Sequence, residues 1–181
     1  MIEAWPRLAS RRVFDAGLFA VTRDRTRSPR TSVAHDVYVV HMPDWLMTVP
    51  LTADGALVMV RQYRHGSRQT SLEIPGGLHD QEKERPEEGA ARELAEETGY
   101  GGGELTPLGE LRPQPALLSN QVRIYLARGV RIIRAPRLDA GEDIEVVLLD
   151  PHEVNERIAR AEINNAMTVA ALGLARFGGY L

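Results

Sequence analysis

Short apolar-rich segments separated by polar stretches run along much of the chain, and this pattern predicts β-strands. Residues 12–22 indicate two short strands around a turn at residues 15–17, and the polar residues 24–34 predict a loop. Asp54-Gly55 lies between two further segments and is typical of a hairpin turn. The further segments that predict strands are 35–41, 45–51, 56–63, 104–110, 121–128 and 143–149.

Helical patterns are fewer and lie in the middle and at the end of the chain. A central helix is expected between Pro86, which suits a first helical turn, and Gly99, which suits the left-handed residue after a helix. An amphipathic helix is expected from near Pro151, and another from about Asn164 to Phe177. The order of strands, central helix, strands and terminal helices predicts an α/β sandwich with a mixed sheet.

The central helix gathers carboxylates on one side. At about 100° per residue, Glu93, Glu96 and Glu97 fall within an arc of about 100°. Leu94 lies on the opposite side, which can pack on a core. Like charges at this spacing repel. A hard divalent cation would compensate them, since Mg²⁺ takes oxygen ligands; the alternative is a solvated acidic helix face.

Composition limits the alternatives. A length of 181 residues supports one domain, with room for a small appendage. The absence of cysteine excludes disulfides and thiolate metal sites. The net charge of −3 gives no case for a nucleic-acid partner. No signal peptide or membrane-length apolar run is seen, so we expect a cytoplasmic protein with no membrane partner.

The segment from Arg92 to Tyr100 reads RELAEETGY and resembles the second half of the Nudix box, G-x5-E-x7-R-E-U-x-E-E-x-G-U, where U is bulky and apolar. Glu84 stands at the required distance, with seven residues between it and Arg92. The loop departs from the pattern, because six residues rather than five separate Gly77 from Glu84. The chain is identified as a member of the Nudix hydrolase family, which implies the Nudix fold, an α/β/α sandwich.

The resemblance also implies a metal centre. The residues that would hold Mg²⁺ or Mn²⁺ are Gly76, through its carbonyl oxygen, and the carboxylates of Glu93, Glu96 and Glu97. Arg92 would orient these carboxylates through charge-assisted hydrogen bonds. Glu84 would stabilise the junction between the loop and the helix or take a metal ion through water.

Residues 60–64 and 72–77 resemble the ADP-ribose pyrophosphatase branch of the family. The resemblance implies that Arg64 contacts the diphosphate or terminal ribose of the substrate, and that Glu73 helps to position the substrate or the loop. Arg61 and Arg64 are three residues apart on a strand, so they point to opposite faces and Arg64 is the one expected at the site.

Two further elements of this branch lie beyond the box. Members specific for ADP-ribose carry a proline about fifteen residues past the box, and Pro115 lies fifteen residues past Tyr100. An ordinary loop proline is the alternative, since QPA replaces the usual SPG at residues 114–116. The resemblance also implies that the loop before the last strand supplies a glutamate as base or metal ligand. Our candidate is Glu142, followed by Asp143 and Glu145, and a simple polar turn is the alternative.

The resemblance divides the chain into a β-rich extension, residues 1–43, and a Nudix domain, residues 44–181. Such extensions pair with a second subunit, so we expect a homodimer. The expected activity is metal-dependent hydrolysis of ADP-ribose, or a related nucleoside diphosphate sugar, to a nucleoside monophosphate and a sugar phosphate. The alternatives are hydrolysis of GDP-mannose or another such sugar, and a non-catalytic module that senses ADP-ribose. The aromatic residues available to stack on a base are Trp5, Phe14, Phe19, Trp45 and Tyr63.

Overall fold

The computed structural model describes residues 2–181, which form two compact units. The first unit holds the N-terminal part of the chain up to Asp44 together with Arg112–Gln121. The second unit holds Trp45–Leu111 and Val122–Leu181. None of the helices in this described part of the chain is long and apolar enough to cross a membrane.

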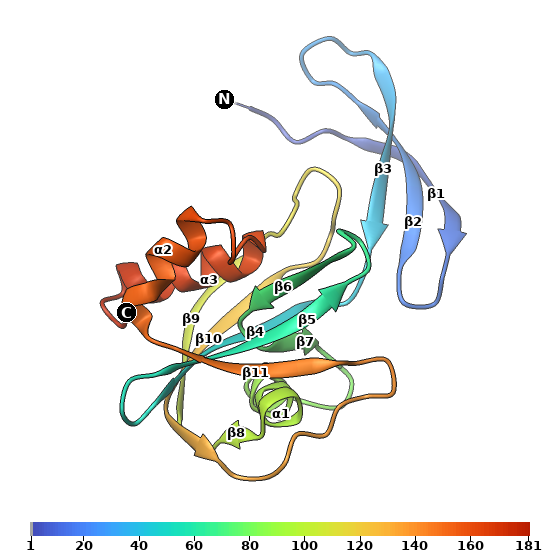
Figure 1. Cartoon of the computed structure of the whole chain (residues 1–181). Coiled ribbons are helices and arrows are strands. Elements are labelled where there is room, and N and C mark those ends of the chain that lie inside the picture. The colour runs from blue at the N-terminus through green and yellow to red at the C-terminus, as the bar shows by residue number, and fades with distance from the viewer. Residues whose placement is uncertain (1) are drawn as a thin grey trace. The chain divides into compact units, whose positions relative to one another are not determined.

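The first unit is built on an antiparallel sheet of β1 (Arg7–Asp15), β2 (Ala20–Arg27) and β3 (Ala34–His41) (Figure 1). The turn expected at residues 15–17 is confirmed, and the N–H of Gly17 donates to Oδ1 of Asp15 at 2.9 Å. The loop predicted for residues 24–34 is wrong in its first part, because β2 continues to Arg27.

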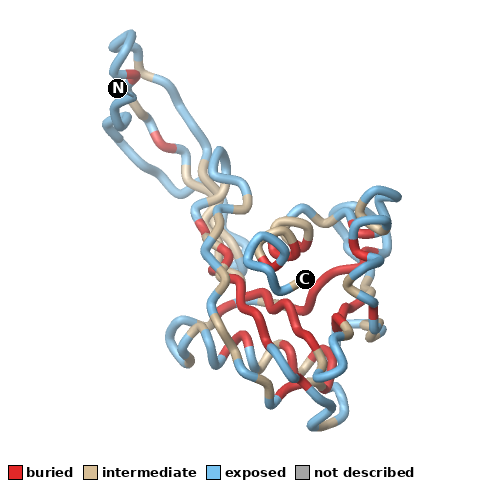
Figure 2. Tube along the Cα trace, turned by 90° about the vertical axis from the view of Figure 1, so that its left-hand side faces the viewer, coloured by how far each residue is buried: buried red, intermediate tan, exposed pale blue. Residues whose placement is uncertain are grey.

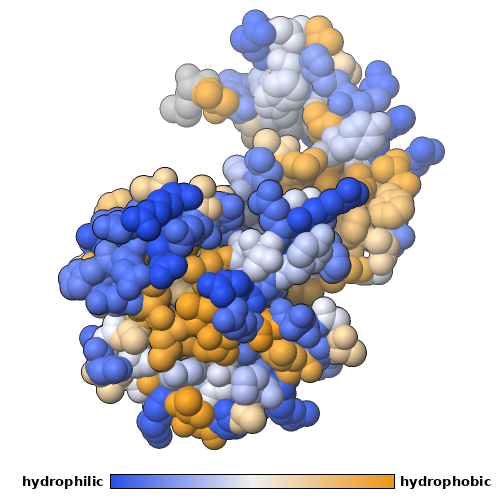
Figure 3. Space-filling model, in the orientation of Figure 1, coloured by the Kyte–Doolittle hydropathy of each residue, from blue (hydrophilic) through white to orange (hydrophobic). Residues whose placement is uncertain are grey.

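The physical reason is that β2 pairs on both edges. Arg25 is opposite Ala9 on β1 and Asp36 on β3, so main-chain hydrogen bonds hold a strand whose side chains are largely polar. Every residue of β1 is exposed (Figure 2). Apolar side chains therefore remain on the surface of this sheet (Figure 3). They include Leu8, Val13, Phe14, Val37 and Tyr38.

The second unit contains a mixed sheet. Its core strands are β11 (Ile144–Leu149), β5 (Leu57–Arg64), β4 (Trp45–Thr52), β10 (Val122–Ile132) and β9 (Glu104–Leu111). β4 and β10 run parallel, and the other pairs are antiparallel. These strands confirm the segments expected from the sequence. The sequence did not predict the short strands β6 (Gln69–Glu73), β7 (Gly76–Leu78) and β8 (Tyr100–Gly101).

Helices cover both faces of this sheet, as the predicted α/β/α sandwich requires (Figure 1). Along β4, Met47 and Val49 pack in one buried cluster with Leu172 of α3 (Ala166–Phe177). The alternate residue Leu46 packs with Ala90 of α1 (Pro86–Thr98) on the other face. A strand buried on both sides reads as a nearly continuous apolar run, which is the sequence of β4. The 3₁₀ turn Pro151–Glu153 and α2 (Val154–Ala159) precede α3.

The ends of α1 follow the sequence expectation. Pro86 occupies the first turn, and the carboxylate of Glu88 accepts the N–H of Arg85 at 3.0 Å. Gly99 ends the helix with φ of 76°, a left-handed conformation that suits glycine. Leu94, which is buried against the sheet, fixes the rotation of the helix. The same rotation turns Glu93, Glu96 and Glu97 toward a hollow beside β5 and β7.

Candidate active site

An acidic pocket of about 270 Å³ lies in the second unit, beside α1. We use this name for the hollow lined by Gln62, Arg64, Gly76, Gly77, Leu78, Arg92, Glu93, Glu96, Glu97, Arg137, Asp139 and Glu142. The lining comes from β5, β7, α1 and the segment before β11, which are far apart in the sequence. The fold thus gathers most of the residues that the sequence singled out.

Glu97 is the most deeply buried acid of the pocket. Its residue is 4% exposed, and its Oε2 accepts the N–H of Gly76 at 3.0 Å. Burial raises the pKa of Glu97 to about 8, and the negative charges of Glu93 and Glu142 act in the same direction. Burial likewise raises the pKa of Glu93, although Arg92 opposes that shift. At both carboxyls burial outweighs the favourable contact, which is the N–H of Gly76 at Glu97 and the guanidinium of Arg92 at Glu93.

Arg92 connects the loop to the acidic side of α1. It donates to both oxygens of Glu84, at 2.9 and 2.7 Å, and to Glu93 at 2.9 Å and Glu96 at 2.8 Å. The hydrogen bonds to Glu84 raise the pKa of Arg92 and hold the pKa of Glu84 below its ordinary value. Arg92 thus contacts the carboxylates that it was expected to orient, and Glu84 links the loop to the helix through it; the orienting role stays a prediction.

The longer loop before the helix folds as a turn. The N–H groups of Lys83 and Glu84 donate to the carbonyl of Asp80 at 3.1 and 3.2 Å. The Nε2 of His79 lies 3.1 Å from the carbonyl oxygen of Glu84. Glu84 still reaches Arg92, so a six-residue spacing leaves the contacts of the helix in place.

Gly77 allows the strand to pass close to an acid of the helix. A Cβ atom built on Gly77 would lie 2.5 Å from the carboxyl carbon of Glu93, closer than real contacts allow. A Cβ on Gly89 would lie 2.6 Å from Oε1 of Glu84. A side chain at either position would therefore displace a neighbouring carboxylate from its place in the structure.

Arg64 lines the acidic pocket, whereas Arg61 does not. Arg64 donates to both oxygens of Glu73 at 2.9 and 2.8 Å. Burial of Glu73 opposes its ionisation, but the bonds and charge of Arg64 outweigh this and hold the pKa of Glu73 below its ordinary value. Arg61 instead pairs with Glu145 at 2.6 Å. The predicted alternation along the strand is observed, and Glu73 contacts Arg64.

Glu142 is the loop acid that reaches the pocket. Its carboxylate accepts the N–H of Asp139 at 2.8 Å, and its own N–H donates to the carbonyl of Asp139 at 3.0 Å. Asp143 and Glu145 are not among the lining residues. Sequence reasoning missed Arg137 and Asp139, which also line the pocket. The available signal was that Arg137 is the single cationic residue of segment 135–143.

Pro115 belongs to the first unit, in the segment Arg112–Gln121. It lies in a turn in which the N–H of Leu117 donates to the carbonyl of Gln114 at 3.0 Å. The second unit contains all residues of the acidic pocket, so the role of Pro115 in substrate recognition stays a prediction.

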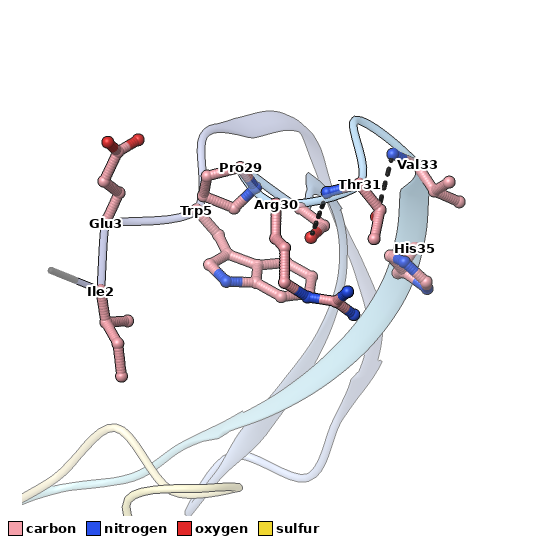
Figure 4. Close-up of a pocket in the computed structure, with 9 residues that line it drawn as sticks. Ile2, Glu3, Trp5, Pro29, Arg30, Thr31, Val33 and His35 are labelled. Carbon is pink, nitrogen blue, oxygen red and sulfur yellow. Dashed lines mark hydrogen bonds between the residues drawn. The ribbon is translucent and has the colours of Figure 1, made fainter.

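A different hollow, of about 790 Å³, lies within the first unit and is lined by Trp5, Arg30 and His35, among others (Figure 4). The rings of Trp5 and His35 lie 5.7 Å apart. Glu3 is the one carboxylate among the described residues that line it, so it lacks the grouped acids of the acidic pocket. The acidic pocket has no aromatic lining residue in the described chain, and the base-stacking residue stays unassigned.

The chemistry of the acidic pocket fits a hard divalent cation. Its donors are carboxylate and carbonyl oxygens, which Mg²⁺ prefers, and the raised pKa of Glu97 marks a place where positive charge would be stabilising. In the described part of the chain, no three acidic or histidine side chains already converge at ligating distances. Arg92 holds Glu93 and Glu96 here, so these side chains would turn to bind a cation.

Comparison with known proteins gives relatives along most of the chain. An ADP-ribose pyrophosphatase of Mycobacterium tuberculosis is 31% identical over 91% of this chain and 80% of its own length. A GDP-mannose pyrophosphatase of Escherichia coli is 32% identical over 86% of this chain and 85% of its own. The crystal structure of an ADP compounds hydrolase superposes with a TM-score of 0.86 at 25% identity, covering 100% of this chain and 99% of the other.

The model of the NUDIX domain matches residues 42–171. That range contains α1, the strands β7 and β8 before and after it, and every residue of the acidic pocket. The mixed sheet between two helical layers agrees with the fold of the superposed hydrolase. The chain therefore belongs to the NUDIX domain family.

Proposed function

We propose that this enzyme hydrolyses the diphosphate of ADP-ribose, or of a closely related nucleoside diphosphate sugar, to a nucleoside monophosphate and a sugar phosphate. The observation that carries the proposal is that one pocket joins Glu97, Glu93 and Glu142 with Arg64 and the glycine-rich strand β7. Relatives that cover most of the chain and are named for ADP-ribose support this substrate.

Nudix hydrolases generally use divalent cations, and we propose Mg²⁺ or Mn²⁺ here. The residues that would hold the cation are Glu93, Glu96, Glu97 and the carbonyl of Gly76. Such a cation neutralises a diphosphate and lowers the pKa of bound water. Its charge would also lower the raised pKa of Glu97, so that this carboxyl stays ionised near neutral pH.

We assign the other roles in catalysis and substrate binding to side chains of the protein. Glu142 lies on the same pocket and is proposed as the base that takes a proton from the attacking water. Arg92 is proposed to orient Glu93 and Glu96 toward the cation, and its hydrogen bonds to both carboxylates support this role. Arg64 is proposed to contact the diphosphate or terminal ribose, held in position by Glu73. Pro115 remains a proposed determinant of substrate choice.

A hydrolysis panel tests the activity and its alternatives. ADP-ribose, NADH, GDP-mannose, diadenosine polyphosphates and nucleoside triphosphates would each be incubated with Mg²⁺ and with Mn²⁺. We expect the highest kcat/KM for ADP-ribose. A preference for GDP-mannose, the substrate named for another relative, would replace the proposed substrate and retain the reaction. Tight ADP-ribose binding without turnover of any compound would instead indicate a sensing module.

Variants of the acids test the assigned roles. Glu97→Gln should abolish turnover without unfolding the protein. Glu142→Gln should lower kcat by about 100-fold or more with little change in KM. Glu88→Gln is the matched control, since Glu88 lies on the same helix but its side chain is 52% exposed and pairs with Arg85. Unchanged kcat in either of the first two variants would remove that residue from the mechanism.

We further propose that residues 1–43 form an extension that mediates homodimerisation of the Nudix domain, residues 44–181. Two strands of this extension, β1 and β3, carry exposed apolar side chains, including Phe14 and Tyr38. A three-stranded sheet is more stable when its apolar residues are covered, and a second copy of the chain would cover them.

A further inference from the structure

Three arginines line the acidic pocket, and they differ in how their charge is used. Arg64 donates two hydrogen bonds to the buried carboxylate of Glu73. Arg92 donates four hydrogen bonds to carboxylates of the loop and the helix. Arg137 has no side-chain hydrogen bond or ion pair with any residue of the described chain. It is therefore the lining arginine whose guanidinium is not already held by a carboxylate.

The backbone of Arg137 is fixed to the helix that carries the acids. Its N–H donates to the carbonyl of Glu96 at 2.8 Å. The N–H of Ile133 donates to the carbonyl of Gly99 at 2.9 Å, and Nε of Arg134 donates to the carbonyl of Ala95 at 3.2 Å. The last carbonyls of a helix have no partner within it. Segment 133–137 supplies such partners and so holds Arg137 at the C-terminal end of α1.

The pocket is lined by several carboxylates, so a cationic side chain there would favour binding of an anionic ligand. Its lining includes the carboxylates of Glu93, Glu96, Glu97, Asp139 and Glu142. A diphosphate entering such a surface is repelled unless cations face its oxygens. A cation held by the helix acids would face one part of the diphosphate. A guanidinium on the loop-borne part of the lining can bind further phosphate oxygens with two parallel hydrogen bonds.

We propose that Arg137 is a substrate-binding residue whose guanidinium binds a phosphate of the diphosphate substrate. The inference rests on the proposed function, because it takes the ligand to be a nucleoside diphosphate sugar. It extends that function by naming a phosphate contact on the segment that also carries Glu142. The competing role is a solvated charge that only balances Asp139 and Glu142.

The test compares Arg137→Gln, Arg137→Lys and the control Arg131→Gln. Arg131 is an exposed arginine nearby in the chain; it donates to the carbonyl of Gly102 and does not line the pocket. With ADP-ribose and Mg²⁺, Arg137→Gln should lower kcat/KM by about tenfold or more, mainly through KM. Arg137→Lys should recover part of the loss, since lysine keeps the charge but not the planar fork. Arg131→Gln should remain within about twofold of the wild type.

A second measurement separates binding from structure. Inhibition by AMP or by ribose 5-phosphate should weaken in Arg137→Gln, while the thermal unfolding midpoint stays that of the wild type. Unchanged KM and unchanged inhibition by both monophosphates would overturn the proposal. So would a lowered unfolding midpoint that accounts for the whole loss of activity.

Failure of the proposed function would give a different result. If the wild type hydrolyses none of the substrates, calorimetric titration with ADP-ribose still tests Arg137 as a phosphate-binding residue. Weaker binding in Arg137→Gln and unchanged binding in Arg131→Gln would support the residue assignment although the reaction is wrong. Equal binding by all variants, or no binding by any, would overturn it.

Discussion

At the residue scale, two arginines of β5 each form an ion pair with a glutamate, and the two pairs differ in how far they are buried. Arg64 and Glu73 form a bidentate pair in which the Glu73 side chain is 1% exposed. Arg61 and Glu145 form a pair in which the side chains are 41% and 64% exposed. An exposed pair contributes little to stability, whereas removing one partner of a buried pair leaves the other without compensation.

Glu73→Gln should therefore lower the free energy of unfolding by about 2 kcal/mol at pH 7. The half-exposed guanidinium of Arg64 keeps this value below that of a fully buried pair. Glu145→Gln is the matched control and should change stability by less than about 1 kcal/mol. Urea unfolding of the three proteins checks both values. Equal losses in the two variants would contradict the difference in environment.

The same pair predicts a pH dependence. The pKa of Glu73 in the folded protein lies below its ordinary value of 4.5. A lowered pKa means that the unfolded chain binds the proton more readily. The stability from ionised Glu73 is thus fully present above pH 4.5 and is lost as the pH falls through the lower folded value. The stability difference between wild type and Glu73→Gln should shrink below pH 4.5, as measured by urea unfolding at stepped pH.

Gly77 gives a second prediction for a single residue. Gly77→Ala places a methyl group against the Glu93 carboxylate and should lower kcat/KM by about tenfold or more by displacing that acid. Stability should change by less than about 1 kcal/mol, because a flexible side chain can move aside. Gly66→Ala is the control, since no atom lies within 4 Å of its added Cβ and its φ is not left-handed. A fully active Gly77→Ala would mean that Glu93 can shift without consequence.

At the scale of elements, Arg92 couples the loop before α1 to the helix. Arg92→Lys should lower kcat/KM by about tenfold or more, because one ammonium group cannot reproduce a fork that reaches Glu84, Glu93 and Glu96 together. The control is Arg85→Lys, which alters an exposed pair with Glu88 at the start of the same helix. Steady-state kinetics over a range of Mg²⁺ concentrations would measure both. Full activity of Arg92→Lys at every concentration would exclude an orienting role.

Elements defined by local sequence were the ones that could be predicted. Pro86 and Gly99 set the ends of α1 by their own backbone preferences, and the acid spacing fixed its polar side. The short β7 could not be predicted, because its three residues are held by pairing with β4 rather than by propensity. The second half of β2 was missed for the same reason.

In the acidic pocket too, features set by local sequence could be predicted and contacts between distant segments could not. Spacing within one helix placed Glu93, Glu96 and Glu97 together, and alternation along one strand separated Arg61 from Arg64. The pairing of Arg64 with Glu73 and the position of Arg137 depend on contacts between distant segments. A single sequence carries no direct signal for such contacts. The residue that stacks on the base could not be predicted either. Five aromatic residues were available, and none of them lines the pocket among the described residues.

At the scale of the whole molecule, the two units bury their apolar residues unequally. The second unit has both faces of its sheet covered by helices. The first unit has no helix in its described residues, and its strands leave Phe14 and Tyr38 more than half exposed, at 53% and 54%. These exposed apolar residues support the proposed pairing of the extension with a second copy of the chain.

We therefore expect light scattering coupled to size exclusion to give a mass of twice the 20.1 kDa chain. Phe14→Glu and Tyr38→Glu should shift the protein toward the monomer, because a buried unpaired charge weakens an interface. Leu148→Glu is the control: Leu148 is 54% exposed but lies on β11 in the second unit, so this variant should remain dimeric. A monomeric mass for the wild type would contradict the proposed homodimer. Dissociation by all three substitutions alike would show that added charge, and not the sheet of the extension, controls assembly.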